Sequence, residues 1–351
     1  MDEYRPKINL RRMVLMAVLA IVFMAIAGWL LSRENFYEML QVISRANYLL
    51  VASAIAAYLI SVAIWAARWQ TALSFIGCRV SFLARYLILW ATVFLNNITP
   101  GARVGGDPFG RLYMLRKLEN ISYSSGMASL IGEFALTPLI VVSLLMAGLF
   151  LQFGKESLGL SLALIGAWVL ASLGTVFFPR LLKRRIALKG ISSIAGHVLS
   201  RFGRLKDVQA TVAGIEAFYS STYTILDRWQ KVLLIGSWTL MTSALDVFRF
   251  YAIFLALGYH PTLSTLLVAS SAQIIVGLVP LLPGGLVLVE GSLISIFVLF
   301  GVPPDVALAT TVIERAITFA LSTIVGAGVF SYLGVKMAAK PEIQNQMGPQ
   351  A

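Results

Sequence analysis

The chain has 351 residues, of which 58% are hydrophobic and only 13% are charged, whereas soluble domains carry roughly 25% charged residues. This composition and a mean hydropathy of +0.83 exclude an ordinary soluble protein and indicate an integral membrane protein. The net charge of +12 is explained by membrane topology and anionic lipid, so nucleic acid is not an expected partner. The single cysteine, Cys78, excludes an intramolecular disulfide and CxxC metal or redox motifs.

The N-terminal part of the chain is a basic tail followed by a hydrophobic segment. Residues 13–31 are too long for a typical signal-peptide core and end without a small-residue cleavage site, so they are predicted to remain as a first span. The Lys and Arg residues before this span place the N-terminus in the cytoplasm. We therefore expect residues 1–47 to form the tail, the first span and a short external segment at 32–46.

The rest of the chain is predicted to contain two similar units joined by a basic segment. Ten Lys and Arg residues lie between positions 180 and 231, so this segment must face the cytoplasm, either as surface helices against headgroups or as a solvated loop. Full spans are expected at about 48–71, 126–151, 158–178, 232–257 and 306–333. The expected boundaries are 48–157 for the first unit with a hairpin at 82–118, 158–231 for a connecting span and the basic loop, 232–335 for the second unit with a hairpin at 263–300, and 336–351 for a disordered cytoplasmic tail.

Each unit contains a Pro-Gly break inside an apolar segment, followed seven residues after the proline by a carboxylate. The two sequences are ITPGARVGGD (98–107) and LLPGGLVLVE (281–290). A broken helix leaves backbone polar groups unpaired, which lipid tolerates only where the break is buried in protein or lines a wet cavity. Asn96 and Asn97, just before the first break, can cap the broken helix. The residues predicted to form the breaks are Pro100, Gly101, Pro283, Gly284 and Gly285.

The charge distribution predicts that the chain turns back at each break. If residues 82–97 crossed the bilayer completely, every later span would invert and the ten-charge segment would face outward, against the positive-inside rule. The predicted fold class is therefore an all-α polytopic membrane protein of the plasma membrane. It has about six full spans and two re-entrant hairpins, that is eight to nine hydrophobic segments, with both termini cytoplasmic. Two short full spans in place of a hairpin remain an alternative.

Other residues also recur between the two units. Arg68 lies nine residues before Gly77, as Arg249 lies nine before Gly258. ASLIGEFALT (128–137) aligns with ATTVIERAIT (309–318), which places Glu133 opposite Glu314 at an offset of 181. Because two spans and a hairpin separate the opening spans of the two units, the copies are predicted to have opposite orientations. Inverted repeats with discontinuous helices are typical of secondary transporters.

Several charged residues fall within the predicted membrane segments. A charge at the bilayer centre costs about 2.5–3.5 kcal/mol on insertion scales, so such residues pair or face a cavity. Asp246 and Arg249 lie three apart and can neutralise each other. Buried ion pairs that lock the helices together are the alternative interpretation. The candidate phosphate-binding residues are Arg68, Arg103, Arg111, Arg249 and Arg315. The candidate gating or proton-linked carboxylates are Asp107, Glu133, Glu290 and Glu314.

Three stretches, 96–116, 282–293 and 301–315, together resemble the flippase-like membrane family that includes the transmembrane region of lysylphosphatidylglycerol synthases. The resemblance covers nearly the whole chain and implies translocation of a phospholipid or polyprenyl-linked lipid between leaflets. The chain ends at Ala351 without the soluble aminoacyl-transferase domain, so lysyl transfer is not expected. The resemblance carries over onto Pro283, Gly284, Gly285, Glu290, Glu314 and Arg315, and onto Pro100, Gly101, Asp107 and Arg111.

These observations predict a lipid transporter that moves an anionic headgroup through a polar cavity between two opposed hairpins. No Walker A, GxSxG or HExxH motif is present, and no catalytic residue, cofactor or metal is predicted. The expected partners are anionic or polyprenyl-linked membrane lipids, and self-association is left open. A membrane enzyme that acts on a lipid-linked sugar or phosphate through hairpin carboxylates is the alternative function. An assembly subunit with a sealed, well-packed centre is a third.

Overall fold

The computed structural model of the chain describes residues 33–99, 105–154, part of 159–173, 205–279 and 283–339. All of the regular structure in these ranges is helical, as expected for the all-α class. The predicted first span at 13–31 and most of the predicted span at 158–178 lie outside the described residues, as do the predicted breaks at Pro100 and Gly101. The count of six full spans therefore stays a prediction.

Four long apolar helical segments can each cross a membrane, in agreement with the spans expected at about 48–71, 126–151, 232–257 and 306–333. A helix of 28 residues such as α3 or α11 is about 42 Å long, which exceeds the roughly 30 Å of bilayer hydrocarbon. The chain is a multi-pass membrane protein. The segments are α3 (Tyr48–Phe75), α6 (Tyr123–Phe134) continuing into α7 (Thr137–Phe153), α11 (Trp229–Ala256), and α14 (Pro304–Arg315) continuing through η3 (Ala316–Leu321) into α15 (Ser322–Ala339).

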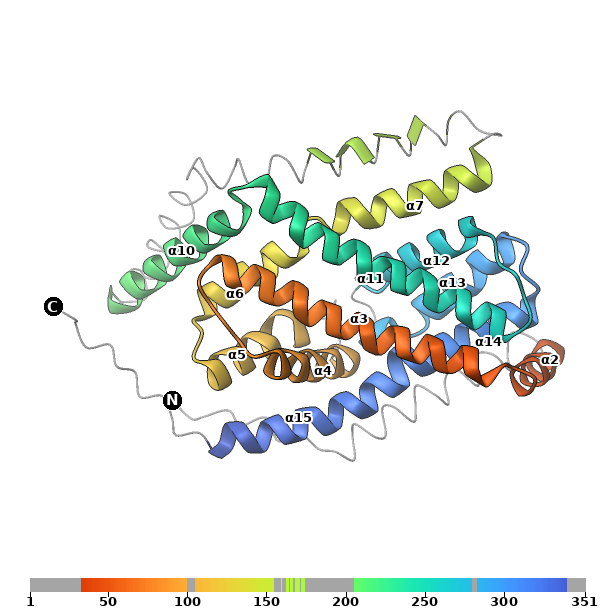
Figure 1. Cartoon of the computed structure of the whole chain (residues 1–351), viewed down its shortest axis with the longest axis horizontal. Helices are drawn as coiled ribbons and strands as arrows, with labels where there is room; N and C mark the ends of the chain where they lie inside the picture. Colours follow the sequence, from red (N-terminus) through yellow and green to blue (C-terminus); the bar gives the residue numbers. More distant parts are fainter. Residues whose placement is uncertain are drawn as a thin grey trace.

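The two predicted hairpin regions contain shorter helices. With 17 and 14 residues, α4 and α12 are about 25 and 21 Å long, too short to cross about 30 Å of hydrocarbon. α4 and α5 lie in one half of the molecule, and α12 and α13 lie in the other (Figure 1). The end of α4 contacts η2, so the described end of the first hairpin's opening helix meets the second break. The elements are α4 (Phe82–Ile98), η1 (Gly105–Gly110), α5 (Arg111–Glu119), α12 (Leu263–Val276), η2 (Pro283–Gly285) and α13 (Leu288–Leu299).

Two further helices lie where the sequence predicted no span. α2 (Arg33–Ser44) falls in the expected external segment and packs against α14. α10 (Leu205–Leu226) falls in the basic segment and packs against α6. The last turns of α10 bury Tyr219, Ile225 and Leu226. This end of α10 is therefore part of the core rather than of the surface segment expected over 180–231.

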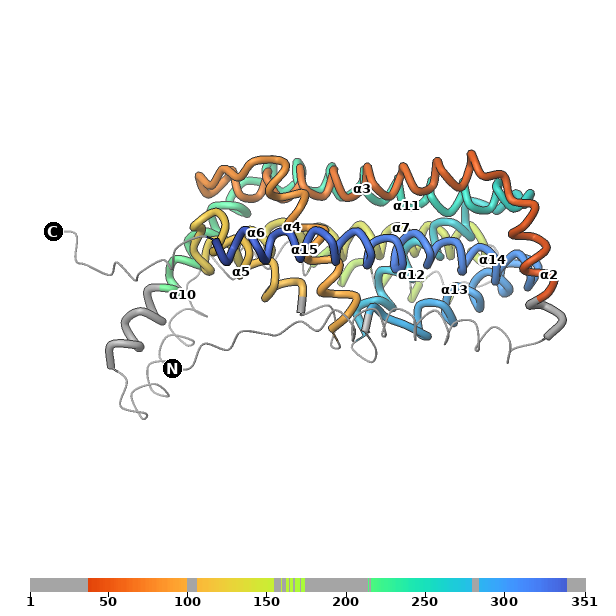
Figure 2. The backbone as a smooth tube through the Cα atoms, turned by 90° about the horizontal axis from the view of Figure 1, so that it is seen from below, coloured from red at the N-terminus to blue at the C-terminus, as the bar shows by residue number. Residues whose placement is uncertain are grey.

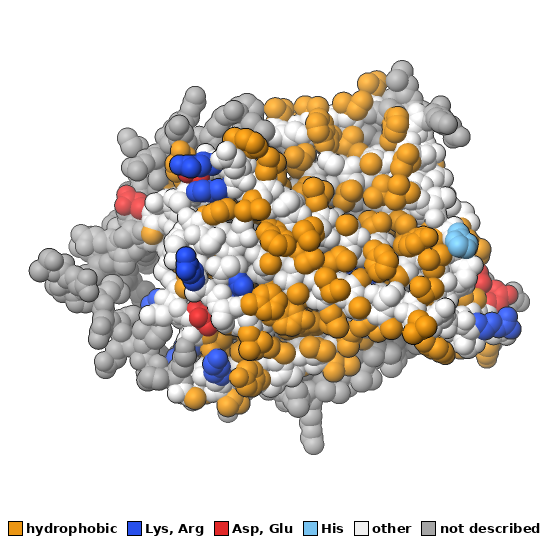
Figure 3. Space-filling view, viewed as in Figure 1, with side chains coloured by type: hydrophobic (Ala, Val, Ile, Leu, Met, Phe, Trp, Pro, Cys, Tyr) orange, Lys and Arg blue, Asp and Glu red, His pale blue; other side chains and the backbone are white. Residues whose placement is uncertain are grey.

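α3 and α11 pack along each other in one layer, antiparallel, and the remaining helices form the layers beneath them (Figures 1 and 2). In these lower layers α15 packs against α4, and α7 packs against α12. Hydrophobic side chains cover the middle of the outer face, whereas Lys and Arg side chains gather at the end of the molecule near α5 and α10 (Figure 3). An apolar band of this kind is what lipid contact requires.

The contact between α15 and α4 depends on a glycine. A Cβ atom at Gly326 would lie 2.5 Å from the carbonyl oxygen of Trp90 and 2.6 Å from Cβ of Phe94, so Gly326→Ala must push the two helices apart. We expect this change to lower the free energy of unfolding by about 1–3 kcal/mol. Gly328→Ala on the same helix is the matched control, because a Cβ there meets no atom within 4 Å. Thermal unfolding in detergent measures both variants, and equal midpoints would contradict the prediction.

Candidate functional site

The second helix break owes its shape to consecutive glycines. Gly284 and Gly285 have φ angles of 62° and 68°, in the left-handed region that residues other than glycine seldom adopt. A Cβ atom at Gly284 would also lie 2.5 Å from the ring of Phe319 and 3.5 Å from Cα of Asn97. The glycine therefore lets the second break approach the end of α4, which brings the two predicted hairpins together.

The first cluster of buried charges centres on Glu133, whose side chain has no exposed surface. Its Oε1 accepts hydrogen bonds from Nε and Nη2 of Arg68, at 3.3 and 3.0 Å, and from Nε1 of Trp65. Its Oε2 accepts from Nη2 of Arg111 at 2.6 Å. Arg111 also donates to Asp107 at 3.2 Å. We call Arg68, Asp107, Arg111 and Glu133 the Glu133 network; its two arginines and two carboxylates balance.

Asn96 forms hydrogen bonds with η1, the segment that follows the first break. Its Oδ1 accepts hydrogen bonds from the backbone N–H groups of Gly106 and Asp107, at 3.0 and 3.1 Å. Its Nδ2 donates to Oδ2 of Asp107 at 3.4 Å. Asn97 instead donates to the hydroxyls of Ser322 and Thr323. Neither side chain caps the end of α4, the role expected of both asparagines; Asn96 caps the returning segment instead.

The second cluster centres on Glu314, which is also fully buried. Arg249 donates to both of its oxygens, from Nε at 2.9 Å and from Nη2 at 3.0 Å. Gln273 donates to Oε1 of Glu314 at 2.9 Å, and Arg249 also donates from Nη1 to Asp246 at 2.6 Å, which confirms the predicted pairing of Asp246 with Arg249. We call Asp246, Arg249, Gln273 and Glu314 the Glu314 network; its two carboxylates face one arginine.

A separate ion pair lies beside the second break. Nε of Arg315 donates to Oε1 of Glu290 at 2.5 Å, and Nη2 donates to the carbonyl oxygen of Gly284 at 3.1 Å. Within the described part of the chain, Nη1 of Arg315 has no acceptor. The buried Oε2 of Glu290 has no donor there either. Arg315 therefore holds the turned backbone and a carboxylate and still has donors to offer.

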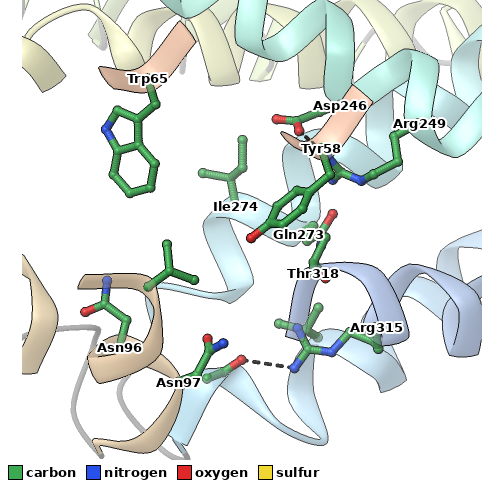
Figure 4. A pocket seen from close by; sticks show the side chains of 13 residues that line it. Tyr58, Trp65, Asn96, Asn97, Asp246, Arg249, Gln273, Ile274, Arg315 and Thr318 are labelled. Carbon is green, nitrogen blue, oxygen red and sulfur yellow. Dashed lines mark hydrogen bonds and ion pairs between the residues drawn. The ribbon is translucent and has the colours of Figure 1, made fainter. Parts of the chain in front are cut away.

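A cavity of about 200 Å³, lined by both polar and apolar side chains, lies between the end of α4 and the second break. Trp65 and Asn96 lie across it from Arg249 and Arg315, with Gln273 and Thr318 between the two arginines (Figure 4). α3, α4, α11, α12 and the segments from η2 to η3 all contribute to its wall. The lining residues are Tyr58, Trp65, Val93, Asn96, Asn97, Asp246, Arg249, Gln273, Ile274, Gly284, Val289, Arg315 and Thr318.

The structure brings some of the sequence-predicted residues to this cavity and places others behind it. Arg249, Arg315 and Gly284 line it, and Glu290 and Glu314 hold its two arginines. The residues of the Glu133 network are not among the lining residues, although Trp65 and Asn96 connect that network to the wall. Arg103 lies outside the described residues.

Sequence reasoning missed Tyr58, Trp65 and Gln273 as lining residues. Tyr58, Trp65 and Arg68 follow the seven- and three-residue spacing of one helix face. Gln273 is the only side-chain amide in α12, whose other residues are apolar or small hydroxyl residues. Both are signals that could have pointed to the cavity.

Comparison with known proteins gives a consistent assignment. The family described as the lysylphosphatidylglycerol synthase TM region matches residues 15–326. A UPF0104 membrane protein of Methanothermobacter thermautotrophicus is 30% identical over 79% of this chain and 81% of its own length. Another, of Pyrococcus horikoshii, is 27% identical over 89% and 94%, respectively.

A further relative has a name that refers to an enzyme. The glycosyltransferase AglD of Haloferax volcanii is 26% identical over 96% of this chain but only 57% of its own length. No solved structure matches the chain. The family match over most of the sequence confirms the resemblance inferred from its motifs: the chain belongs to the family of the lysylphosphatidylglycerol synthase transmembrane region.

Proposed function

We propose that this protein moves the anionic headgroup of a phospholipid or polyprenyl-linked lipid across the bilayer through the central cavity, while the lipid tails stay in the hydrocarbon. The observation that carries the proposal is the cavity itself, which two arginines line between the end of α4 and the second helix break. A guanidinium group matches the oxygens of a phosphate and suits this task. Arg249 and Arg315 are the proposed phosphate contacts, because both line the cavity.

An inverted repeat supports a transport mechanism. α3 and α11 each have 28 residues, and every boundary of α11 lies 181 positions after that of α3. α6 and α14 each have 12 residues at the same offset. The contact of α15 with α4 corresponds to that of α7 with α12, and the contact of α2 with α14 to that of α10 with α6. Because α3 and α11 are antiparallel (Figure 1), we infer that the two units are inverted copies with opposed re-entrant hairpins, as in secondary transporters.

We further propose that the end of the bundle near α5 and α10 faces the cytoplasm. Lys and Arg side chains gather there (Figure 3), as the positive-inside rule requires. α15 ends on the same side (Figure 1), which would place the C-terminus in the cytoplasm. The basic residues of this end include Arg79, Arg116, Lys117, Arg228 and Lys231.

A plug in the cavity wall tests the proposal. Ile274 lines the cavity, so Ile274→Trp is expected to reduce the movement of fluorescent phosphatidylglycerol and polyprenyl phosphate in reconstituted vesicles to the rate of protein-free vesicles. The label exposed on the outer leaflet is quenched with dithionite. Ile275→Trp is the matched control, because Ile275 is 40% exposed and does not line the cavity. Equal rates for the two variants, or no movement of either lipid by the wild type, would contradict the proposal.

A membrane enzyme acting on a lipid-linked sugar or phosphate is the second candidate, favoured by the similarity to AglD over 96% of this chain. It requires carboxylates that act as acid and base, and Asp246 is the one that lines the described cavity. The two functions predict different products. Incubation with a polyprenyl phosphate sugar, followed by mass spectrometry, yields a covalently altered lipid if the protein is an enzyme and an unaltered lipid if it is a transporter.

A further inference from the structure

Glu290 differs from the other buried carboxylates in how it is held. Only 8% of the residue is exposed, yet its Oε2 has no hydrogen-bond donor among the described residues. Glu133 and Glu314, by contrast, accept hydrogen bonds at both oxygens. A buried carboxylate of this kind depends for its charge on one partner. For Glu290 this partner is Arg315.

Arg315 is also one of the two proposed phosphate contacts. Its guanidinium already donates hydrogen bonds to Glu290 and to the carbonyl of Gly284, and Arg315 lines the cavity. A phosphate that takes the Nε and Nη donors of Arg315 must compete with the Glu290 carboxylate for them. Once displaced, that carboxylate would remain in a buried position without a cation, which is costly unless it becomes neutral.

We propose that Glu290 binds a proton when a lipid phosphate replaces it on Arg315, so that each anionic headgroup crosses together with one proton. The inference rests on the proposed transport function. The proton comes from water on the side where the phosphate enters and binds Glu290 at Oε2. It leaves on the other side when the phosphate departs and Nε of Arg315 returns to the carboxylate. The pair of anion and proton is neutral, so the membrane potential does not oppose its passage.

The surroundings of Glu290 single it out as the proton-binding group. α13 packs against α12, which carries no titratable side chain, and against α14. Asp246, which lines the cavity, and Glu314 behind it already share Arg249. Within the described ranges, the charged or titratable groups of the cavity wall are Tyr58, Asp246, Arg249 and Arg315. α14 adds Glu314 and, in its first turn at the end opposite Arg315, Asp305.

The sign of the pH effect follows from this exchange. Protonation of Glu290 frees Arg315, so lowering the pH favours binding of the phosphate. If one proton is taken up for each phosphate bound, apparent affinity rises about tenfold for each unit by which the pH is lowered. Glu290→Gln mimics the protonated state and is expected to make movement independent of pH but sensitive to membrane potential.

The experiment uses the full chain in vesicles with fluorescent phosphatidylglycerol and a pH-sensitive dye in the lumen. This phosphodiester is chosen because a phosphomonoester titrates near pH 6 and would confuse the readout. We expect the wild type to acidify the lumen in step with inward lipid movement, and Glu290→Gln to move lipid without protons. Asp305→Asn, a carboxylate-to-amide change in the first turn of α14, is the control and should retain the wild-type pH dependence.

The outcomes separate this inference from the proposed function. Lipid movement by the wild type without proton movement, or an unchanged pH dependence in Glu290→Gln, would overturn the proton site and leave the transport function standing. Failure of the wild type to move any anionic lipid would overturn both. If Glu290→Gln does not fold, the proton-to-lipid ratio of the wild type still decides, since the proposal requires a ratio of one.

Discussion

Replacing Glu133 by glutamine is expected to lower the free energy of unfolding by about 3–5 kcal/mol, the cost of breaking a buried ion pair on one side. The shape of the side chain is retained, so the loss comes from its charge. Glu133 has no exposed surface and accepts hydrogen bonds from Arg68, Arg111 and Trp65. Without it, Arg111 keeps only Asp107 and Arg68 keeps no carboxylate partner in the described network, so one cation remains uncompensated in the core.

Glu314→Gln is the matched control, because Glu314 is the corresponding residue of the second unit. There Arg249 keeps the carboxylate of Asp246 at 2.6 Å, so the remaining pair is balanced. We expect a loss of about 1–3 kcal/mol, that of hydrogen bonds to a charged group. Denaturation by SDS in mixed micelles compares the two variants. An equal loss, or a larger one for Glu314→Gln, would show that charge balance does not govern the stability of these networks.

The comparison of the two glutamates shows how far sequence reasoning reached. The offset between the two units predicted that Arg68 corresponds to Arg249, and Glu133 to Glu314. It left both glutamates without assigned partners, although in each unit the arginine and the glutamate are 65 residues apart. Because equivalent residues of a repeat make equivalent contacts, the equal spacing could have predicted both pairs. The four long helices were predictable because their hydrophobic lengths exceed the bilayer thickness.

Other features depended on the three-dimensional path of the chain. Gly284 and Asn97, which approach each other, are 187 positions apart in the sequence, and no local pattern specifies such a contact. The candidate site residues were drawn from both units. In the structure, Arg111 reaches Glu133 from the returning segment of the first unit, whereas Arg315 reaches Glu290 beside the cavity in the second. Arg68 and Arg111 of the first unit are therefore buried behind the cavity, whereas Arg249 and Arg315 of the second unit line it.

This asymmetry makes Arg315 the residue on which we expect movement of lipid to depend most. Arg315→Lys keeps the charge but replaces a planar group with several donors by a compact ammonium group. A lysine cannot offer a phosphate two donors in one plane while it also holds the carbonyl of Gly284, as the guanidinium can once the phosphate has displaced Glu290. Losing one hydrogen bond to a charged group costs about 1.5–3 kcal/mol, so the rate of movement of fluorescent phosphatidylglycerol should fall about 10- to 100-fold.

Arg85→Lys controls for the general effect of replacing a buried arginine. Arg85 is 6% exposed, lies in the first turn of α4 and donates to Gln70, at the opposite end of that helix from the cavity. This variant should move lipid at the wild-type rate, whereas Arg315→Lys should not. Thermal unfolding in detergent checks that both variants are folded. Wild-type rates for Arg315→Lys would remove Arg315 from the phosphate path. Its remaining roles would then be its contacts with Glu290 and with the carbonyl of Gly284, each of which needs a single donor that a lysine can supply.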